Sequence, residues 1–114
     1  MEGHGADPRA FFEEAEPKLY KKLVEEFEAL NGVKFQLALK LQLQKVNQDG
    51  SVEYTSPVLR HKQEAVLHRG EIKEALNRAF SQIQELLEKW TQRGSGWAVD
   101  RVETLWLDIA RYSH

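Results

Sequence analysis

The sequence contains no cysteine among its 114 residues. The chain therefore forms no disulfide, binds no metal through thiolates and has no cysteine nucleophile, and it suits a reducing compartment. It also has no apolar run close to the roughly 20 residues that cross a bilayer. Residues 1–6 lack the basic and apolar regions of a signal peptide and read as a disordered or expression-derived tail. We therefore expect an intracellular protein, cytoplasmic or nuclear, without a membrane partner.

Residues that hold metals or phosphates are few and unsuitably spaced. None of the four histidines lies at a metal-ligand spacing; they are His4, His61, His68 and His114. We interpret His61 and His68 as ordinary surface or half-buried side chains that flank a strand. A glycine-rich phosphate loop opens a helix, whereas Gly94 and Gly96 follow a predicted helix. The sequence thus predicts neither a cofactor nor a metal site.

The carboxylates near the C-terminus come nearest to a catalytic cluster. Asp100 and Asp108 share strand parity, but the extended chain between them spans about 26 Å. Glu103 is predicted to point to the opposite face of the strand. A metal-dependent nuclease needs its carboxylates at one shared point. We therefore expect the protein not to be an enzyme and to have no small-molecule substrate.

Residues 33–44 show a strict period of two. The apolar side chains occupy the odd positions: Val33, Phe35, Leu37, Leu39, Leu41 and Leu43. The even positions are Lys or Gln, apart from Ala38. This alternation is typical of a β-strand that buries one face, and it runs longer than most strands. It predicts one long strand with a polar second face, running to about residue 46.

Two segments show helical spacing. Asp7 and Pro8 predict a helix start, a short turn follows through Phe11 and Phe12, and Pro17 restarts the helix with a kink. An apolar stripe then continues to Asn31–Gly32, which predicts a left-handed C-cap. Residues 70–92 carry a second, continuous apolar stripe, and Gly94-Ser95-Gly96 ends that helix.

Two further strands complete the pattern. Residues 47–50 end in Asp-Gly and predict a hairpin turn, and residues 51–67 predict an irregular return strand with a bulge or break near Ser56–Pro57. Residues 97–112 contain a closing strand, with Leu105, Leu107 and Ile109 on its inner face. Its outer face carries Thr104, Trp106 and Asp108.

The element order is therefore α-β-β-α-β. We predict a two-layer α+β sandwich, in which a three-stranded antiparallel sheet is backed by two helices, as a single domain over residues 7–114. This is the order of a ferredoxin-like unit that lacks its first strand. The missing strand would leave an exposed edge, and such edges invite pairing with a partner or a second copy.

The polar face of the sheet is the candidate binding surface. Its predicted members are Lys34, Gln36, Lys40, Gln42, Arg60, Lys62 and Trp106. An aromatic ring among cations on an open sheet is how small α+β modules bind single-stranded DNA or RNA. The chain has a net charge of −2, however, which is unfavourable for strong binding of phosphates. Residues 33–69 are the most basic stretch, with six basic and three acidic side chains.

A protein interface is the other interpretation of this surface. An exposed Trp106 and Val46 would pack against a partner or against the missing strand, because aromatic side chains are favoured at interface cores. We therefore expect a non-enzymatic interaction or assembly domain, with single-stranded nucleic-acid binding as the alternative. Trp90 and Trp97 bracket the Gly94–Gly96 turn; we interpret them as closing one end of the core, rather than as the walls of a binding cleft.

Two stretches resemble a known group of proteins. They are Asn31-Gly32-Val33-Lys34-Phe35 at the start of the long strand, and Arg93-Gly94-Ser95-Gly96-Trp97 followed by Arg101, Leu105, Leu107, Ile109 and Tyr112. Over about residues 25–112 the chain resembles a region of proteins from Maverick or Polinton and adintovirus-like mobile elements, which carry a B-family DNA polymerase. The resemblance implies a domain excised from a longer polypeptide and a setting near DNA or viral assembly. It brings no catalytic residue with it.

Overall fold

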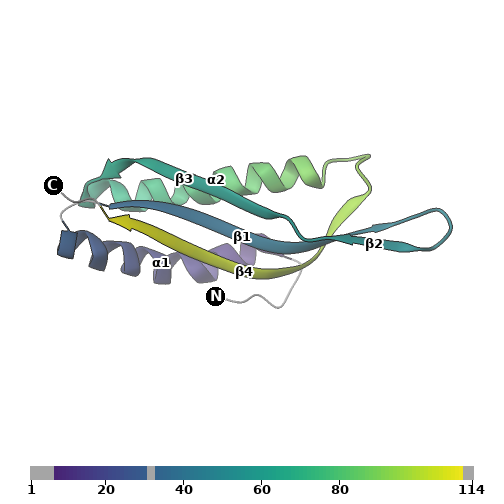
Figure 1. The fold of residues 1–114 in the computed structure, drawn as a ribbon, viewed down its shortest axis with the longest axis horizontal. Helices are drawn as coiled ribbons and strands as arrows, with labels where there is room; N and C mark the ends of the chain where they lie inside the picture. Colours follow the sequence, from purple (N-terminus) through teal and green to yellow (C-terminus); the bar gives the residue numbers. More distant parts are fainter. Residues whose placement is uncertain (1–6, 31–32, 112–114) are drawn as a thin grey trace.

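The computed structural model describes residues 7–30 and 33–111. The expected tail over residues 1–6, the C-cap at residues 31–32 and Tyr112 lie outside the described residues. The elements are α1 (Pro8–Leu30), β1 (Val33–Val46), β2 (Val52–Thr55), β3 (Val58–Leu67), a short 3₁₀ turn (Arg69–Glu71), α2 (Ile72–Trp90) and β4 (Trp97–Arg111). Figure 1 shows them as an elongated molecule.

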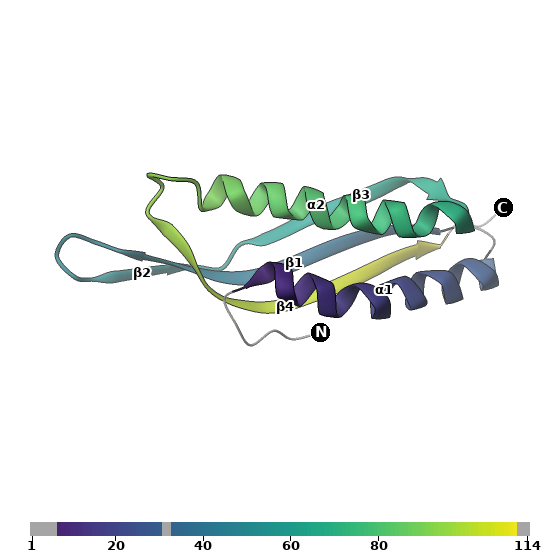
Figure 2. The ribbon, with the colours of Figure 1, turned by 180° about the vertical axis from the view of Figure 1, so that it is seen from behind.

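The strands form one antiparallel sheet, and both helices lie on the same side of it (Figures 1 and 2). The central strand is β1, which pairs with β4 along one side and with β3 and then β2 along the other. The predicted α+β sandwich is confirmed. The sheet has four strands rather than three, because the return arm breaks at Ser56–Pro57, where a proline lacks the N–H that a ladder needs.

The comparison with a ferredoxin-like unit needs one correction. In that topology the last strand pairs with the first strand, which this chain lacks. Here β4 pairs directly with β1, from Val33 opposite Arg111 to Lys45 opposite Trp97. No vacant position therefore remains inside the sheet. Its outer strands are β4 on one side and β3 with β2 on the other.

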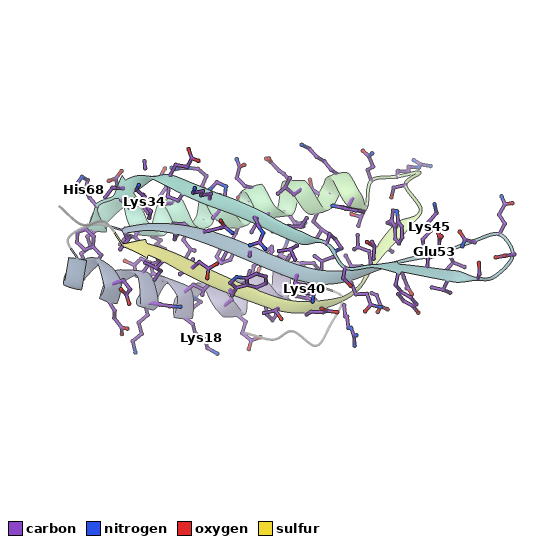
Figure 3. All side chains as sticks on the ribbon, in the orientation of Figure 1. Lys18, Lys34, Lys40, Lys45, Glu53 and His68 are labelled. Carbon is purple, nitrogen blue, oxygen red and sulfur yellow. The ribbon has the colours of Figure 1, made fainter. Side chains whose placement is uncertain are left out.

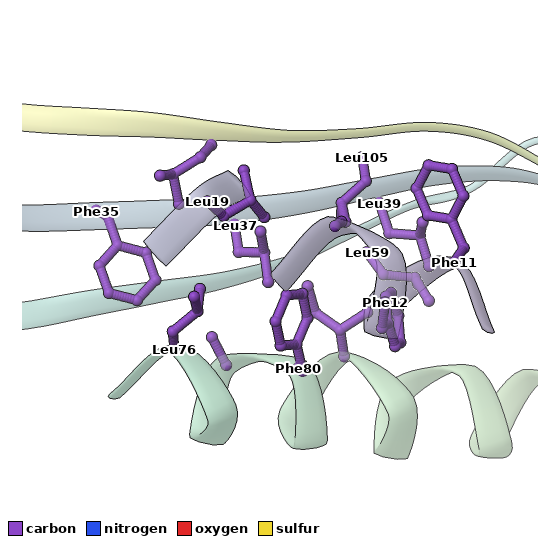
Figure 4. Close-up of a cluster of buried hydrophobic side chains, with 14 of the residues drawn as sticks. Phe11, Phe12, Leu19, Phe35, Leu37, Leu39, Leu59, Leu76, Phe80 and Leu105 are labelled. Atoms are coloured by element: carbon purple, nitrogen blue, oxygen red, sulfur yellow. The ribbon is translucent and has the colours of Figure 1, made fainter. Parts of the chain in front are cut away.

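The core lies between the sheet and the helices. All the odd-numbered residues of β1 from Val33 to Leu43 are at most 1% exposed, as the alternation predicts. They face α1, which lies over β1 and β4, and α2, which lies over β1 and β3. Figure 4 shows Leu37 and Leu39 of β1 among Leu76 and Phe80 of α2. The opposite face of the sheet has no helix against it within the described residues (Figure 1).

The first helix differs from the expectation. It runs without interruption from Pro8 to Leu30, with Pro17 inside it, rather than restarting at that proline. Asp7 caps its start, because Oδ1 accepts hydrogen bonds from the backbone N–H groups of Arg9 (3.1 Å) and Ala10 (3.4 Å). Phe11 and Phe12 are both buried in the core. Their burial on the sheet stabilises the N-terminal half, which offsets the backbone hydrogen bond that Pro17 lacks.

Candidate binding face

The candidate residues lie on the side of the sheet away from the helices, here called the open face. Residues that pair across neighbouring strands lie on the same face of the sheet. The pairing register places three rows of such residues on the open face. Lys62, Gln36 and Asp108 form one row, Arg60, Ala38 and Trp106 the next, and Val58, Lys40 and Thr104 the third. Lys34 and Gln42 continue the open face along β1 in both directions. All seven candidate residues therefore lie on one face, on three adjacent strands, and Figure 3 labels Lys34 and Lys40 along β1.

Trp106 and Arg60 lie on either side of Ala38. The Arg60 guanidinium carbon is 5.7 Å from the centroid of the Trp106 ring, a cation–π distance. Ala38 is completely buried although it faces away from the helices. Its small side chain leaves room for the two larger ones to close over it, and Trp106 is only half-exposed as a result. The sequence prediction identified Arg60 and Trp106 but missed the role of Ala38.

Glu103 is placed differently from the prediction. The pairing between β1 and β4 shifts register between Lys40 and Leu41, so that a β-bulge accommodates Glu103. Its carboxylate lies 3.7 Å from Lys40 Nζ and 3.9 Å from Arg101 Nε, whereas strict alternation would point it to the opposite face. The Arg101 guanidinium also donates a hydrogen bond to Gln42 Oε1 (3.2 Å). This carboxylate offsets part of the positive charge at the middle of the open face.

A small hollow opens on this face near the start of β1. It measures about 190 Å³ and is lined by Lys34, Phe35, Gln36, Lys62, Gln63, Asp108 and Ile109. The pairing of β1 with β3 is irregular between Val33 and Phe35, which separates the side chains at that point. The hollow holds two cations and one carboxylate. Its two ammonium groups attract an anion, and the Asp108 carboxylate opposes one.

The hairpin of β1 and β2 projects beyond both helices (Figures 1 and 2). Three apolar or aromatic side chains are exposed there: Val46 (65%), Val52 (42%) and Tyr54 (57%). Val46 pairs with Val52 and Gln44 pairs with Tyr54, so these side chains continue the open face onto the arm. We call Val46, Val52 and Tyr54 the hairpin patch. Of the expected pair, Val46 is exposed as predicted, whereas Trp106 is partly covered.

The edges of the sheet are only partly open. On the outer side of β4, the Leu107 carbonyl accepts a hydrogen bond from Lys22 Nζ of α1 (3.5 Å). On the other side, the edge consists of β3, which is ten residues long and carries Lys62 and Glu64, and of β2, which is four residues long and carries Glu53. Short strands and charged side chains are usual devices against edge-to-edge pairing. These features favour the face of the hairpin over the sheet edges as the surface for a partner.

His61 lies in β3 opposite Leu37, on the side that α2 covers. Its Nε2 is buried without a hydrogen-bond partner. Burial lowers the pKa of His61, and the nearby Arg78 guanidinium lowers it further. His68 is exposed at the end of β3. His61 is therefore a half-buried side chain of the fold, as the sequence indicated, and lies outside the open face.

The lowered pKa of His61 predicts a pH-dependent stability. Because the folded state has the lower pKa, the unfolded chain binds more protons near pH 6, and the stability falls as the pH drops through the folded-state pKa. We expect urea unfolding to show a loss of stability from neutral to mildly acidic pH that His61→Gln diminishes. His68→Gln, at an exposed site, is the control. Parallel pH profiles for wild type and His61→Gln would contradict this assignment.

The two tryptophans beside the turn do not share one role. Trp97 is half-buried and packs against the core, as predicted. Trp90 is 37% exposed, so the prediction that it closes the core is wrong. Trp90 is the last residue of α2, and from there the chain leads away from the sheet before β4 begins (Figure 1).

Three further findings concern metal binding, membrane spanning and similarity to known proteins. Within residues 7–30 and 33–111, no group of three or more His, Asp or Glu side chains is arranged to hold a metal ion. Neither described helix combines the length and the hydrophobicity of a membrane-spanning segment. The chain matches no family model, no curated protein and no solved structure. The open face and the hairpin patch are therefore interpreted from their own chemistry.

Proposed function

We propose that this chain is a non-enzymatic interaction domain that associates with a protein partner through the open face of its sheet, with a second copy of the chain as the first partner to test. The observation that carries the proposal is the hairpin patch. The setting that we propose is assembly within a larger mobile-element or virus-like protein, in line with the resemblance of residues 25–112.

The placement of the patch supports this proposal. β4 pairs with β1 only as far as Lys45, so the arm is two-stranded where Val46 pairs with Val52, and a two-stranded ribbon gains little stability from its own packing. The three large side chains of the patch are held in water and add nothing to the core, whereas covering them with a partner removes apolar area from water. Tyr54 also adds a hydroxyl to an apolar ring, the combination that is enriched at protein interfaces. The charged open face beside it would form the polar rim.

Self-association through the patch predicts a concentration-dependent mass. We expect sedimentation equilibrium of the wild-type chain from micromolar to millimolar concentration to show a dimer or larger species. Val46→Glu combined with Tyr54→Glu should return it to a monomer, because two buried carboxylates without partners oppose association. Gln82→Glu with Gln92→Glu adds the same charge at exposed positions and is the control. A wild-type chain that stays monomeric throughout would contradict self-association.

Single-stranded nucleic acid is the second candidate partner. The Lys34–Lys62 hollow lies one row from Trp106, so a phosphate in the hollow and a base near the ring are about 7 Å apart, close to one nucleotide step. Glu103 beside Lys40 acts against this reading. The binding residues would be Lys34, Lys40, Arg60, Lys62 and Trp106.

Fluorescence anisotropy of labelled single- and double-stranded oligonucleotides, both DNA and RNA, at two salt concentrations tests this candidate. We expect affinity that falls with salt and is lost in Lys40→Glu combined with Lys62→Glu, because each phosphate contact releases counterions. Lys18→Glu with Lys73→Glu, at exposed positions of α1 and α2, controls for net charge. Equal oligonucleotide affinity of the two double variants would exclude the open face as the binding surface. If the wild-type chain binds no oligonucleotide at low salt, nucleic acid is excluded as a partner.

A further inference from the structure

A second hollow lies away from the open face, where α2 ends and β4 begins. It measures about 420 Å³ and is lined by Lys89, Trp90, Ser95 and Trp97. Lys89 and Trp90 come from the last turn of α2, and Trp97 is the first residue of β4. Figure 1 shows the intervening turn folding back beside the sheet. We call this hollow the tryptophan cleft.

The walls of the tryptophan cleft are held by local hydrogen bonds. The Thr91 backbone N–H and hydroxyl both donate to the Leu87 carbonyl at 3.0 Å, which ends α2. The Ser95 N–H donates to the Gln92 carbonyl (3.0 Å), and the Trp97 backbone N–H donates to Ser95 Oγ (3.1 Å). Gly94 and Gly96, both at positive φ, supply the backbone that this turn requires. These bonds fix the backbone of the turn that joins Trp90 to Trp97.

The chemistry of the lining selects a ligand class. The side chains around the tryptophan cleft offer an ammonium group, a hydroxyl and two indole N–H groups, but no carboxylate. The Lys45 ammonium lies 5.8 Å from the centroid of the Trp97 ring, and the Glu53 carboxylate on the opposite residue of β2 offsets part of its charge. Trp90, at 37% exposure, presents indole surface to solvent. Such a site favours an anion rich in hydrogen-bond acceptors that also has a flat ring.

The end of a helix carries partial negative charge, which opposes an anion. Two features reduce that opposition here. Thr91 satisfies the Leu87 carbonyl twice, and Lys89 lies in the last turn of α2. The Thr91 hydroxyl and the Lys89 ammonium therefore offset part of the negative charge at this end of α2.

We propose that the tryptophan cleft binds a nucleoside phosphate, with the base against the Trp90 indole and the phosphate near Lys89. Indole rings stack on any base, and a lysine ammonium pairs with phosphate as a point charge. The nucleotide is either free or at the end of a single strand. This site uses no residue of the hairpin patch or of the open-face candidates, so it goes beyond the proposed association and stands apart from it.

Intrinsic fluorescence tests the proposal directly. In the Trp106→Phe variant the remaining tryptophan emission, excited selectively over that of the three tyrosines, comes from Trp90 and Trp97 alone. We expect adenosine 5′-monophosphate to quench it saturably, with weaker effects from adenosine and from inorganic phosphate. A short oligoadenylate separates the two sources of the ligand: tighter binding than the mononucleotide indicates a strand end, and equal binding indicates a free nucleotide.

Equilibrium dialysis of labelled adenosine 5′-monophosphate measures how much Trp90 and Lys89 each contribute to the binding affinity. Trp90→Ala should weaken binding by about fivefold or more, the lower limit for one stacked base. Lys89→Gln should weaken binding and reduce its salt dependence, whereas Lys73→Gln, at an exposed site in the first turn of α2, should leave both unchanged. Because Trp90 and Lys89 are exposed, we expect circular dichroism to show that these variants retain the fold.

Three results would overturn the proposal. In the first, neither the mononucleotide nor the oligonucleotide quenches the emission saturably. In the second, Trp90→Ala binds with wild-type affinity. In the third, a proline-rich or acidic peptide quenches the emission whereas neither nucleotide does. Lys40→Glu with Lys62→Glu, and the variants of the hairpin patch, should leave mononucleotide binding unchanged. The experiments therefore distinguish a wrong proposal for the open face from a wrong proposal for the tryptophan cleft.

Discussion

We expect replacement of Leu39 with alanine to lower the free energy of unfolding by about 3 kcal/mol, and replacement of the adjacent Lys40 with alanine to change it by less than about 0.5 kcal/mol. Leu39 has no exposed surface and lies in the core under the helices. Truncating it removes buried apolar contacts and leaves a cavity. Lys40 is on the open face, and its ion pair with Glu103 is partly exposed, which limits its contribution to stability.

Urea unfolding followed by circular dichroism measures both changes, with the dependence on denaturant concentration expected to stay constant. The two residues are consecutive in β1, so the pair isolates the effect of the face from that of position along the strand. Equal losses for both variants would mean that the open face is covered in solution. Such a result would itself point to a stable self-associated form.

We expect replacement of Phe12 with alanine to lower the free energy of unfolding by about 3–5 kcal/mol. The Phe12 ring is 7% exposed and stacks on the Phe80 ring of α2, with the centroids 5.1 Å apart. This contact joins the N-terminal half of α1 to α2. Its loss should free that half of the helix, while the rest of the core persists.

Chemical denaturation of Phe12→Ala, Phe80→Ala and the double variant forms a cycle for this contact. We expect a coupling energy of about 0.5–1.5 kcal/mol between the two rings. Phe12→Leu keeps part of the burial and provides a measurable variant if the alanine form does not fold. Glu13→Ala, at the adjacent exposed position, is the control. Additive losses, or a Phe12→Ala variant as stable as the control, would contradict the packing of α1 on α2.

Part of the candidate site was predictable from the sequence. Residues 34 and 40 belong to the open face because side chains alternate along a strand, and Trp106 shares that face for the same reason. Pro57 also predicted the break between β2 and β3, since a proline cannot donate to the ladder. Each of these predictions depends only on neighbours along the chain.

Other features could not be predicted in that way. Glu103 joins Lys40 because of a bulge whose position depends on how β4 pairs with β1. Ala38 is buried on the open face only because Arg60 and Trp106 meet across two strands. Both outcomes depend on residues far apart in the chain, and nothing in the local pattern records them.

The sequence by itself determined the α+β class, the order of the helices and strands, and the face on which each β1 side chain lies. These properties follow from the periods of two and of about 3.6 residues that burial of one face imposes on strands and helices. Only the tertiary structure decided that β4 pairs directly with β1, that α1 continues through Pro17, and that Trp90 and Trp97 line a cleft. Those outcomes depend on which surfaces, far apart in the chain, pack against each other and so bury their apolar area. That choice is made by the packing of the whole chain.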